Sequence, residues 1–286
     1  MTTGSFYRKL FLMAGLCGSV LCSSPRTAEA QNGCASETYK VQGKPLKTYL
    51  YKPSGFNAQT PLVFIMTGTK RNANTYCKQW LKHARAKGFA LLVPKFDTRQ
   101  FPGSRTYHQG NVLNSAGGLN PESSWAYSAI DGLFQQFKTR HRSVLSHYSI
   151  YGHSAGAQFV HRLVMFKPQS PIKTAVAANA GYYTLPQNQP YPYGVQGIPF
   201  SNRAFLQPLL ILLGEKDVDP HHRYLRKTLQ AMEQGPHRLA RGLNFFKRAK
   251  QEAKKAGISF RWRIQGVKGV GHSNSKMARA AVRYLP

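Results

Sequence analysis

The chain has 286 residues, 42% hydrophobic and 17% charged, so it can bury a sizeable core and is neither disordered nor fibrous. Forty Lys and Arg residues against ten Asp and Glu give a formal net charge of +30. No apolar run reaches the roughly 18 residues that a membrane-spanning helix needs.

The first 30 residues are typical of a secretion signal. Arg8 and Lys9 precede an apolar run that ends at Cys22, and residues 28–30 (AEA) have the small-x-small form that a signal peptidase accepts. Cleavage after residue 30 is therefore expected, with export to the periplasm or the medium. A short N-terminal membrane anchor is the alternative.

Two cysteines, Cys34 and Cys77, remain after that cleavage. In an exported protein such a pair predicts a disulfide, and two unpaired thiols are the alternative. The bridge would tie the N-terminal segment to the first helix and contribute on the order of 3–4 kcal/mol through chain entropy. The expected organisation is a signal peptide (1–30), a lead segment (31–45) and a single α/β domain (46–286).

Strands and helices alternate along the rest of the chain, which predicts a mostly parallel sheet flanked by helices. Short continuous apolar runs such as LLILL are typical of strands that are buried on both faces. The predicted strands are residues 48–52, 61–67, 89–94, 147–151, 173–178, 209–213 and 259–267. The predicted helices are residues 74–87, 122–139, 155–166, 238–256 and 274–284.

Two long stretches interrupt this alternation, residues 97–120 and residues 181–203. Long irregular loops inside a compact domain are usually functional or mobile. The second is rich in Tyr, Pro and Gly, and we interpret its aromatic residues as a wall or flap over a pocket. A surface loop held by its own aromatic side chains is the alternative. The tentative substrate-binding residues are Tyr182, Tyr183, Tyr191 and Tyr193.

The most informative motif is a G-x-S-x-G sequence, residues 152–156 (GHSAG). It follows the predicted strand HYSIY and opens the predicted helix AGAQFVHRLVMF, which is the strand–turn–helix context of a nucleophile elbow. The flanking glycines allow a turn too tight for side chains. Ser154 would then be exposed at a helix N-terminus that favours negative charge.

A serine nucleophile needs a base, and the base needs an orienting acid. The strand PLLILL leads into GEKDVD, where Asp217 is the preferred acid and Asp219 the alternative. His272 follows the last predicted strand in a glycine-rich loop and is the candidate base. The expected oxyanion donors are the backbone N–H groups of Ala155 and Thr69, the second from the loop after PLVFIMT.

The combination of elbow, acid and base resembles the α/β-hydrolase superfamily. Residues 61–94 (PLVFIMTGTKRNANTYCKQWLKHARAKGFALLVP) look like the esterase branch that includes poly(3-hydroxybutyrate) depolymerases and feruloyl esterases. The resemblance runs from about Leu46 to the C-terminus and implies an α/β-hydrolase fold with Ser154, Asp217 and His272 as triad. One departure is Thr67, which stands where the branch usually has a histidine.

These patterns predict an exported serine hydrolase that cleaves small or polymeric carboxylic esters without a cofactor. A peptidase or amidase with the same triad and a non-catalytic polyanion-binding protein are the alternatives. The adjacent His221 and His222 have no partner cluster with metal-ligand spacing, so no metal is expected. Basic residues around helix 238–256 fit an ordinary amphipathic helix better than a polyanion-binding face, and no specific nucleic-acid motif is present.

Overall fold

The computed structural model describes residues 1–3 and 33–286, so nearly all of the predicted signal peptide lies outside the described residues. Within that part, eight strands form one sheet in the order β1-β2-β4-β3-β5-β6-β7-β8. β1 and β2 are antiparallel to their neighbours, and the strands from β4 to β8 run parallel. The strands are β1 (Ala35–Val41), β2 (Lys44–Tyr51), β3 (Leu62–Met66), β4 (Ala90–Pro94), β5 (Tyr148–His153), β6 (Ile172–Ala178), β7 (Leu209–Gly214) and β8 (Arg263–Val267).

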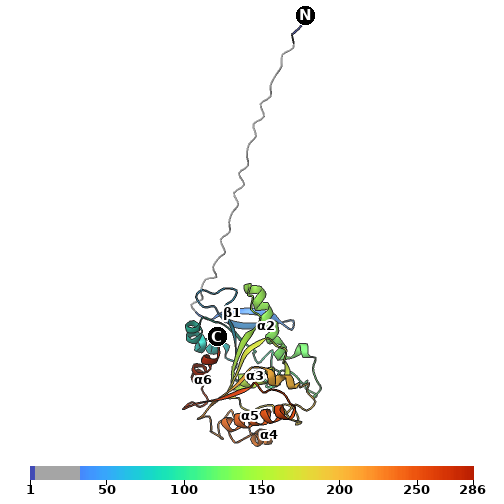
Figure 1. Cartoon of the computed structure of the whole chain (residues 1–286), viewed down its shortest axis with the longest axis vertical. Helices are drawn as coiled ribbons and strands as arrows, with labels where there is room; N and C mark the ends of the chain where they lie inside the picture. Colours follow the sequence, from blue (N-terminus) through green and yellow to red (C-terminus); the bar gives the residue numbers. More distant parts are fainter. Residues whose placement is uncertain (4–32) are drawn as a thin grey trace.

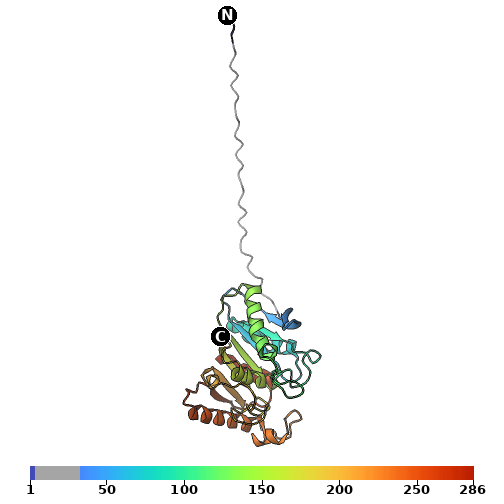
Figure 2. The same cartoon turned by 90° about the vertical axis from the view of Figure 1, so that its right-hand side faces the viewer.

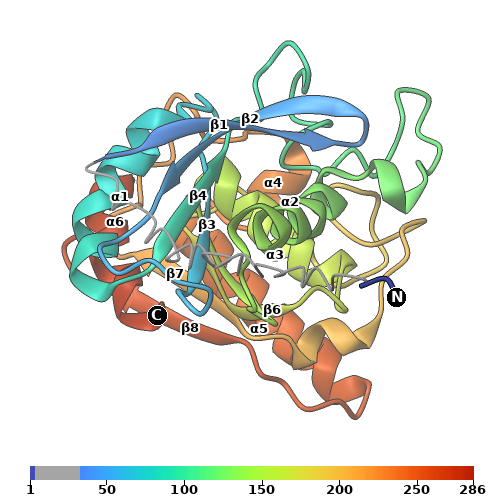
Figure 3. The same ribbon diagram turned by 90° about the horizontal axis from the view of Figure 1, so that it is seen from above.

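Helices cover both faces of this sheet. Figure 3 shows α1 and α6 on one face and α2 and α3 on the other. Figures 1 and 2 place α2 and α5 toward opposite ends of the folded domain, beside the two ends of the strand order. The helices are α1 (Ala73–Lys87), α2 (Ala126–His141), α3 (Ala155–Phe166), α4 (Leu229–Glu233), α5 (Arg238–Lys255) and α6 (Asn274–Ala281), with 3-10 turns η1 (Glu122–Ser124), η2 (Asn202–Leu206) and η3 (Val282–Tyr284).

The central strands are apolar because the two helical layers exclude water from both of their faces. Every residue of β3, β4, β5 and β7 is buried. β8 forms one edge of the sheet and keeps exposed residues along its length. The predicted architecture, a mostly parallel sheet flanked by helices, is confirmed.

The N-terminal hairpin is the main difference from the sequence prediction. The expected lead segment contains β1, which pairs with β2 and belongs to the sheet. Only Tyr39 and Val41 are buried in β1, so its sequence lacks the continuous apolar run of an internal strand. The predicted helix 122–139 is likewise split, because η1 and Trp125 precede α2.

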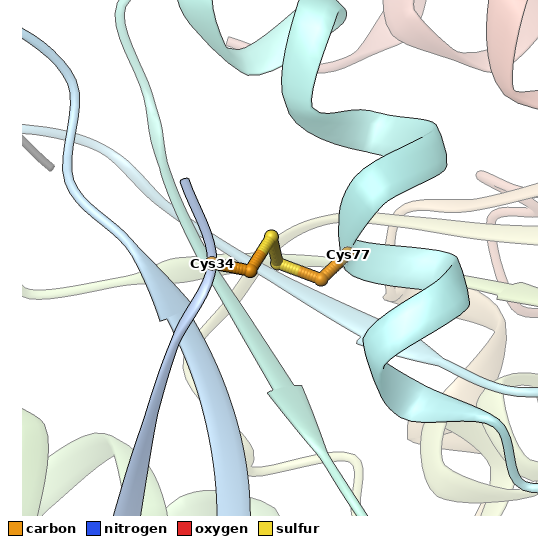
Figure 4. Close-up of a disulfide and its surroundings, with 2 residues drawn as sticks. All are labelled: Cys34 and Cys77. Carbon is orange, nitrogen blue, oxygen red and sulfur yellow. A yellow bond between two sulfur atoms is a disulfide. The ribbon is translucent and has the colours of Figure 1, made fainter. Parts of the chain in front are cut away.

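The predicted disulfide between Cys34 and Cys77 is present, with an S–S distance of 2.03 Å (Figure 4). It joins the residue before β1 to the buried side of α1, across 43 positions of sequence. The antiparallel hairpin is thereby fixed covalently to the parallel part of the domain. No helix among residues 1–3 and 33–286 is long and apolar enough to cross a membrane.

The two long loops are held by buried arginines. Arg162 of α3 donates to the Thr184 hydroxyl and to the carbonyl of His108, which ties the loops to one helix. Arg241 of α5 donates to the carbonyls of Gly181 and Arg226. Both arginines are 0% exposed. Charge-assisted hydrogen bonds to carbonyls offset the cost of burying each guanidinium in a chain with few carboxylates.

Candidate active site

Ser154 lies at a tight turn between β5 and α3. Its φ of 58° and ψ of −116° are a strained backbone conformation for a residue with a side chain. The flanking glycines permit it: a Cβ on Gly152 would lie 2.1 Å from the carbonyl oxygen of Gly156, and a Cβ on Gly156 would lie 2.1 Å from that of Met66. The turn projects Ser154 from the carboxyl end of the sheet, as the motif predicts.

The structure brings Ser154, His272 and Asp217 together from three separate parts of the chain. The Ser154 Oγ lies 3.0 Å from Nε2 of His272, and Nδ1 of the same ring lies 2.7 Å from Oδ2 of Asp217. Asp217 is 3% exposed, whereas the alternative acid, Asp219, is exposed and accepts a hydrogen bond from the backbone N–H of His221. The arrangement therefore contains Asp217 and not Asp219.

The loops that carry Asp217 and His272 are bonded to each other. The Lys216 backbone N–H donates to the carbonyl of Val270. Asn179, which follows β6, donates to the carbonyl of Gly271 and accepts from the backbone N–H of Gly214. The Asn179 side chain thus spans the ends of two strands and the histidine loop, a role that its sequence position did not reveal.

Comparison with solved structures finds relatives that share the whole fold. The chain is 36% identical to poly(aspartic acid) hydrolase-1 from Sphingomonas sp. KT-1, with a TM-score of 0.86 over 88% of this chain and 98% of that one. It belongs to the α/β-hydrolase superfamily. LpqC, a poly(3-hydroxybutyrate) depolymerase from Bordetella parapertussis, is 28% identical with a TM-score of 0.84, over 87% of this chain and 88% of that chain.

An S-formylglutathione hydrolase from Agrobacterium tumefaciens shares the fold at 16% identity and a TM-score of 0.58, over 88% of this chain and 92% of that chain. No protein-family model matches the sequence, and no curated protein matches it either. The match to a poly(3-hydroxybutyrate) depolymerase confirms the predicted branch of the superfamily.

The expected oxyanion loop of this α/β-hydrolase lies directly beside Ser154. Within the described chain, the backbone N–H groups of Thr69 and Ala155 have no hydrogen-bond acceptor, so both remain available to a ligand. Thr67 stands where the resemblance to the esterase branch implies a histidine, and here a tyrosine holds its backbone. Its carbonyl accepts a hydrogen bond from the hydroxyl of Tyr107 at 2.7 Å, in a buried setting.

A cleft of about 210 Å³ opens beside the serine. Tyr224 is its most exposed aromatic residue, with 52% of its surface accessible, and comes from the loop between Asp217 and α4. The sequence prediction did not identify this residue, although its place after a parallel strand of an α/β sheet was a usable signal. The cleft is lined by Gly68, Thr69, Lys70, Asn72, Tyr76, His153, Ser154, Tyr224, His272 and Asn274.

The surroundings of the site favour an ionised Asp217 and a neutral His153. Burial raises the pKa of Asp217, but hydrogen bonds and charges from His272 and Arg238 outweigh it and hold that pKa below its usual value. Burial, aided by the charges of His272 and Arg238, lowers the pKa of His153 well below normal. His153 therefore packs against the His272 ring, centroid to centroid at 4.7 Å, as an uncharged neighbour.

The four tyrosines predicted to bind substrate lie elsewhere. Among the residues that the structure describes, none of the four lines the cleft beside Ser154. Tyr183 is fully buried and stacks on Phe245, and the Tyr191 hydroxyl donates to the carbonyl of Gln109. Tyr182 and Tyr193 pack against each other. This placement corresponds to the alternative of a loop held by its own aromatic side chains, because burying these rings gains more than exposing them at a cleft.

Proposed function

We propose that the chain is a serine hydrolase that cleaves carboxylic esters through an acyl-enzyme. One observation carries the proposal: an unbroken hydrogen-bonded series runs from the Ser154 hydroxyl through both nitrogens of His272 to the buried carboxylate of Asp217. Each member is within the distance that proton transfer requires. The family relationship supports the same reaction class.

In the proposed reaction, the Ser154 oxygen attacks the acyl carbon while His272 Nε2 accepts the hydroxyl proton. Asp217 orients the ring and stabilises its charged form. The resulting imidazolium then donates that proton to the leaving alcohol, and the acyl group remains on Ser154. Water next attacks the acyl-enzyme, with His272 again accepting and returning the proton, and the acid is released.

We assign the oxyanion to the backbone N–H groups of Thr69 and Ala155. Both belong to residues beside Ser154, and Ala155 opens α3, where the helix dipole favours negative charge. Loss of one such donor typically costs about 10²–10³ in rate. These two groups account for the charge that develops on the acyl oxygen in each half of the reaction.

A p-nitrophenyl ester series from acetyl to dodecanoyl tests the proposal on the purified mature protein beside Ser154→Ala. We expect turnover by the wild type and a loss of up to about 10⁶ in kcat for the variant. A fluorophosphonate probe, followed by mass spectrometry, should label Ser154 alone. Absence of both turnover and labelling in folded wild-type protein would refute a serine hydrolase.

Cleavage of amide bonds in an acidic polymer is the second candidate. Two observations favour it: the 36% identity to a poly(aspartic acid) hydrolase and the net charge of +30, which attracts polyanions. Assays on poly(aspartic acid) and on a poly(3-hydroxybutyrate) suspension, run side by side, distinguish amide cleavage from ester cleavage. Release of aspartate oligomers that weakens steeply with added salt would favour the acidic polyamide.

We also propose export, with cleavage after residue 30. The disulfide is consistent with an oxidising compartment, where such bonds persist. Expression of the full chain with a secretion-competent host, followed by N-terminal sequencing of the exported product, should give Gln31 as its first residue. Retention of residues 1–30 on a membrane-bound product would favour the anchor instead.

A further inference from the structure

The carboxylate of Asp217 is held at both of its oxygens. Oδ2 faces His272, and Oδ1 accepts a hydrogen bond from Nη1 of Arg238 at 3.1 Å. Arg238 is the first residue of α5 and is 1% exposed, so this ion pair is shielded from water. Within the described residues, Asp217 is the one carboxylate paired with Arg238.

The other arm of the guanidinium contacts a different element. Nη2 of Arg238 lies 3.1 Å from Nδ1 of His222, and the His222 ring lies 5.4 Å from that of His272. Burial and the charge of Arg238 lower the pKa of His222, which keeps its Nδ1 available as an acceptor. His222 belongs to the same loop as Tyr224, which lines the cleft.

We propose that Arg238 is a positioning residue for the triad: it fixes the plane of the Asp217 carboxylate and ties the loop of His222 and Tyr224 to it. The proposal rests on the proposed hydrolase function. A carboxylate with one partner can rotate about its last bond, whereas two partners on separate oxygens define its orientation toward His272. The planar fork of arginine suits this double contact, and the point charge of lysine does not.

A stabilising role alone is a weaker explanation for a pair buried this deeply. Taking two charges out of water costs about as much as their attraction returns, so buried ion pairs contribute little net stability. A buried ion pair affects the protonation of nearby groups more than it affects stability, because a charge changes the proton affinity of its neighbours. The titratable groups next to the His272 ring are Asp217, His222 and His153 of β5, and Arg238 of α5 contacts both Asp217 and His222. The charge of Asp219 acts on His222.

Removal of the guanidinium should therefore favour proton binding at the site. In Arg238→Met we expect kcat to fall roughly 10- to 100-fold with little change in KM, since a displaced acid misaligns the base. The acid limb of the kcat/KM profile should move upward by about 1 pH unit. Arg238→Lys keeps the charge, so its acid limb should stay in place while kcat still falls.

The experiment compares pH–rate profiles of wild type, both Arg238 variants and Arg248→Met, with folding checked by near-UV circular dichroism. Arg248 is an exposed arginine of the same helix and controls for loss of one charge. The proposal would be overturned if Arg238→Met folds and keeps the wild-type pH–rate profile. It would also be overturned if that variant loses activity equally at every pH, with no shift of the acid limb. If that variant does not fold, wild-type kcat in Arg238→Lys would overturn it. Wild-type protein without activity or probe labelling would instead refute the hydrolase function itself.

Discussion

The hydroxyl of Tyr107 donates a hydrogen bond to the backbone carbonyl of Thr67, and this contact anchors the loop that approaches Ser154. The ring of Tyr107 also lies under the guanidinium of Arg71, 4.4 Å from its centroid. Arg71 in turn donates to the carbonyls of Phe96 and Phe101. The first long loop thus helps to hold the loop that approaches Ser154.

Tyr107→Phe should lower both stability and turnover. The buried Thr67 carbonyl would lose its partner, at a cost of about 1–2 kcal/mol in the free energy of unfolding. Because Thr69 would be held less firmly, we expect kcat to fall about tenfold with KM nearly unchanged. Urea unfolding and steady-state kinetics measure the two effects. Tyr191→Phe removes a similar bond, to the carbonyl of Gln109, and should reduce stability but not kcat.

Tyr224→Ala should weaken substrate binding. Its ring is half exposed at the cleft, and its ring contact in the described structure is with His222, so we expect KM to rise about 3- to 10-fold with kcat within a factor of two. The effect should be largest for long acyl chains in the ester series. Leu229→Ala, at a position that is 73% exposed on α4, is the control. An unchanged KM for every chain length would exclude Tyr224 from the binding surface.

Gly156→Ala should prevent correct folding of the elbow. The added Cβ would stand 2.1 Å from the carbonyl oxygen of Met66, which belongs to β3 and cannot move freely. We expect little soluble protein and no activity from any that is recovered. Gly132→Ala introduces the same methyl group into open space on α2 and should raise stability by up to about 1 kcal/mol. Thermal unfolding of both variants distinguishes the steric clash at Gly156 from a general effect of replacing glycine by alanine.

Glu37 should make the stability of the domain depend on pH. Burial raises its pKa, but hydrogen bonds from His141 and Tyr39 outweigh this and lower the pKa to about 2. The folded value lies below the unfolded one, so the stabilisation is present above about pH 4.5 and is lost as the pH falls toward 2.

The difference in melting temperature between wild type and Glu37→Gln should accordingly be largest near pH 6 and shrink on acidification. Glu233→Gln, at an exposed position on α4, should show a small difference that is similar at both ends of the range. If the difference in melting temperature between wild type and Glu37→Gln stays constant from pH 6 to pH 3, Glu37 does not have the lowered pKa described above.

The sequence determined the internal strands, the helix α3 and the serine turn. These features depend on local rules: continuous apolar runs mark strands buried on both faces, and two glycines around Ser154 mark a turn with no space for side chains. The order of serine, aspartate and histidine along the chain also favoured Ser154, Asp217 and His272 as the candidate catalytic residues. The pairing of Cys34 with Cys77 followed from counting the cysteines that remain after the signal.

The tertiary structure alone decided which groups meet. The sequence favoured Asp217 over Asp219 because it comes earlier after the strand, but only the fold places it within 2.7 Å of His272 and in contact with Arg238. The tyrosines of residues 181–203 were assigned to the cleft from composition, yet they pack inward. Tyr224, on a shorter loop, lines the cleft instead. Burial of an aromatic side chain depends on distant partners, such as Phe245 for Tyr183, and local sequence carries no information about them.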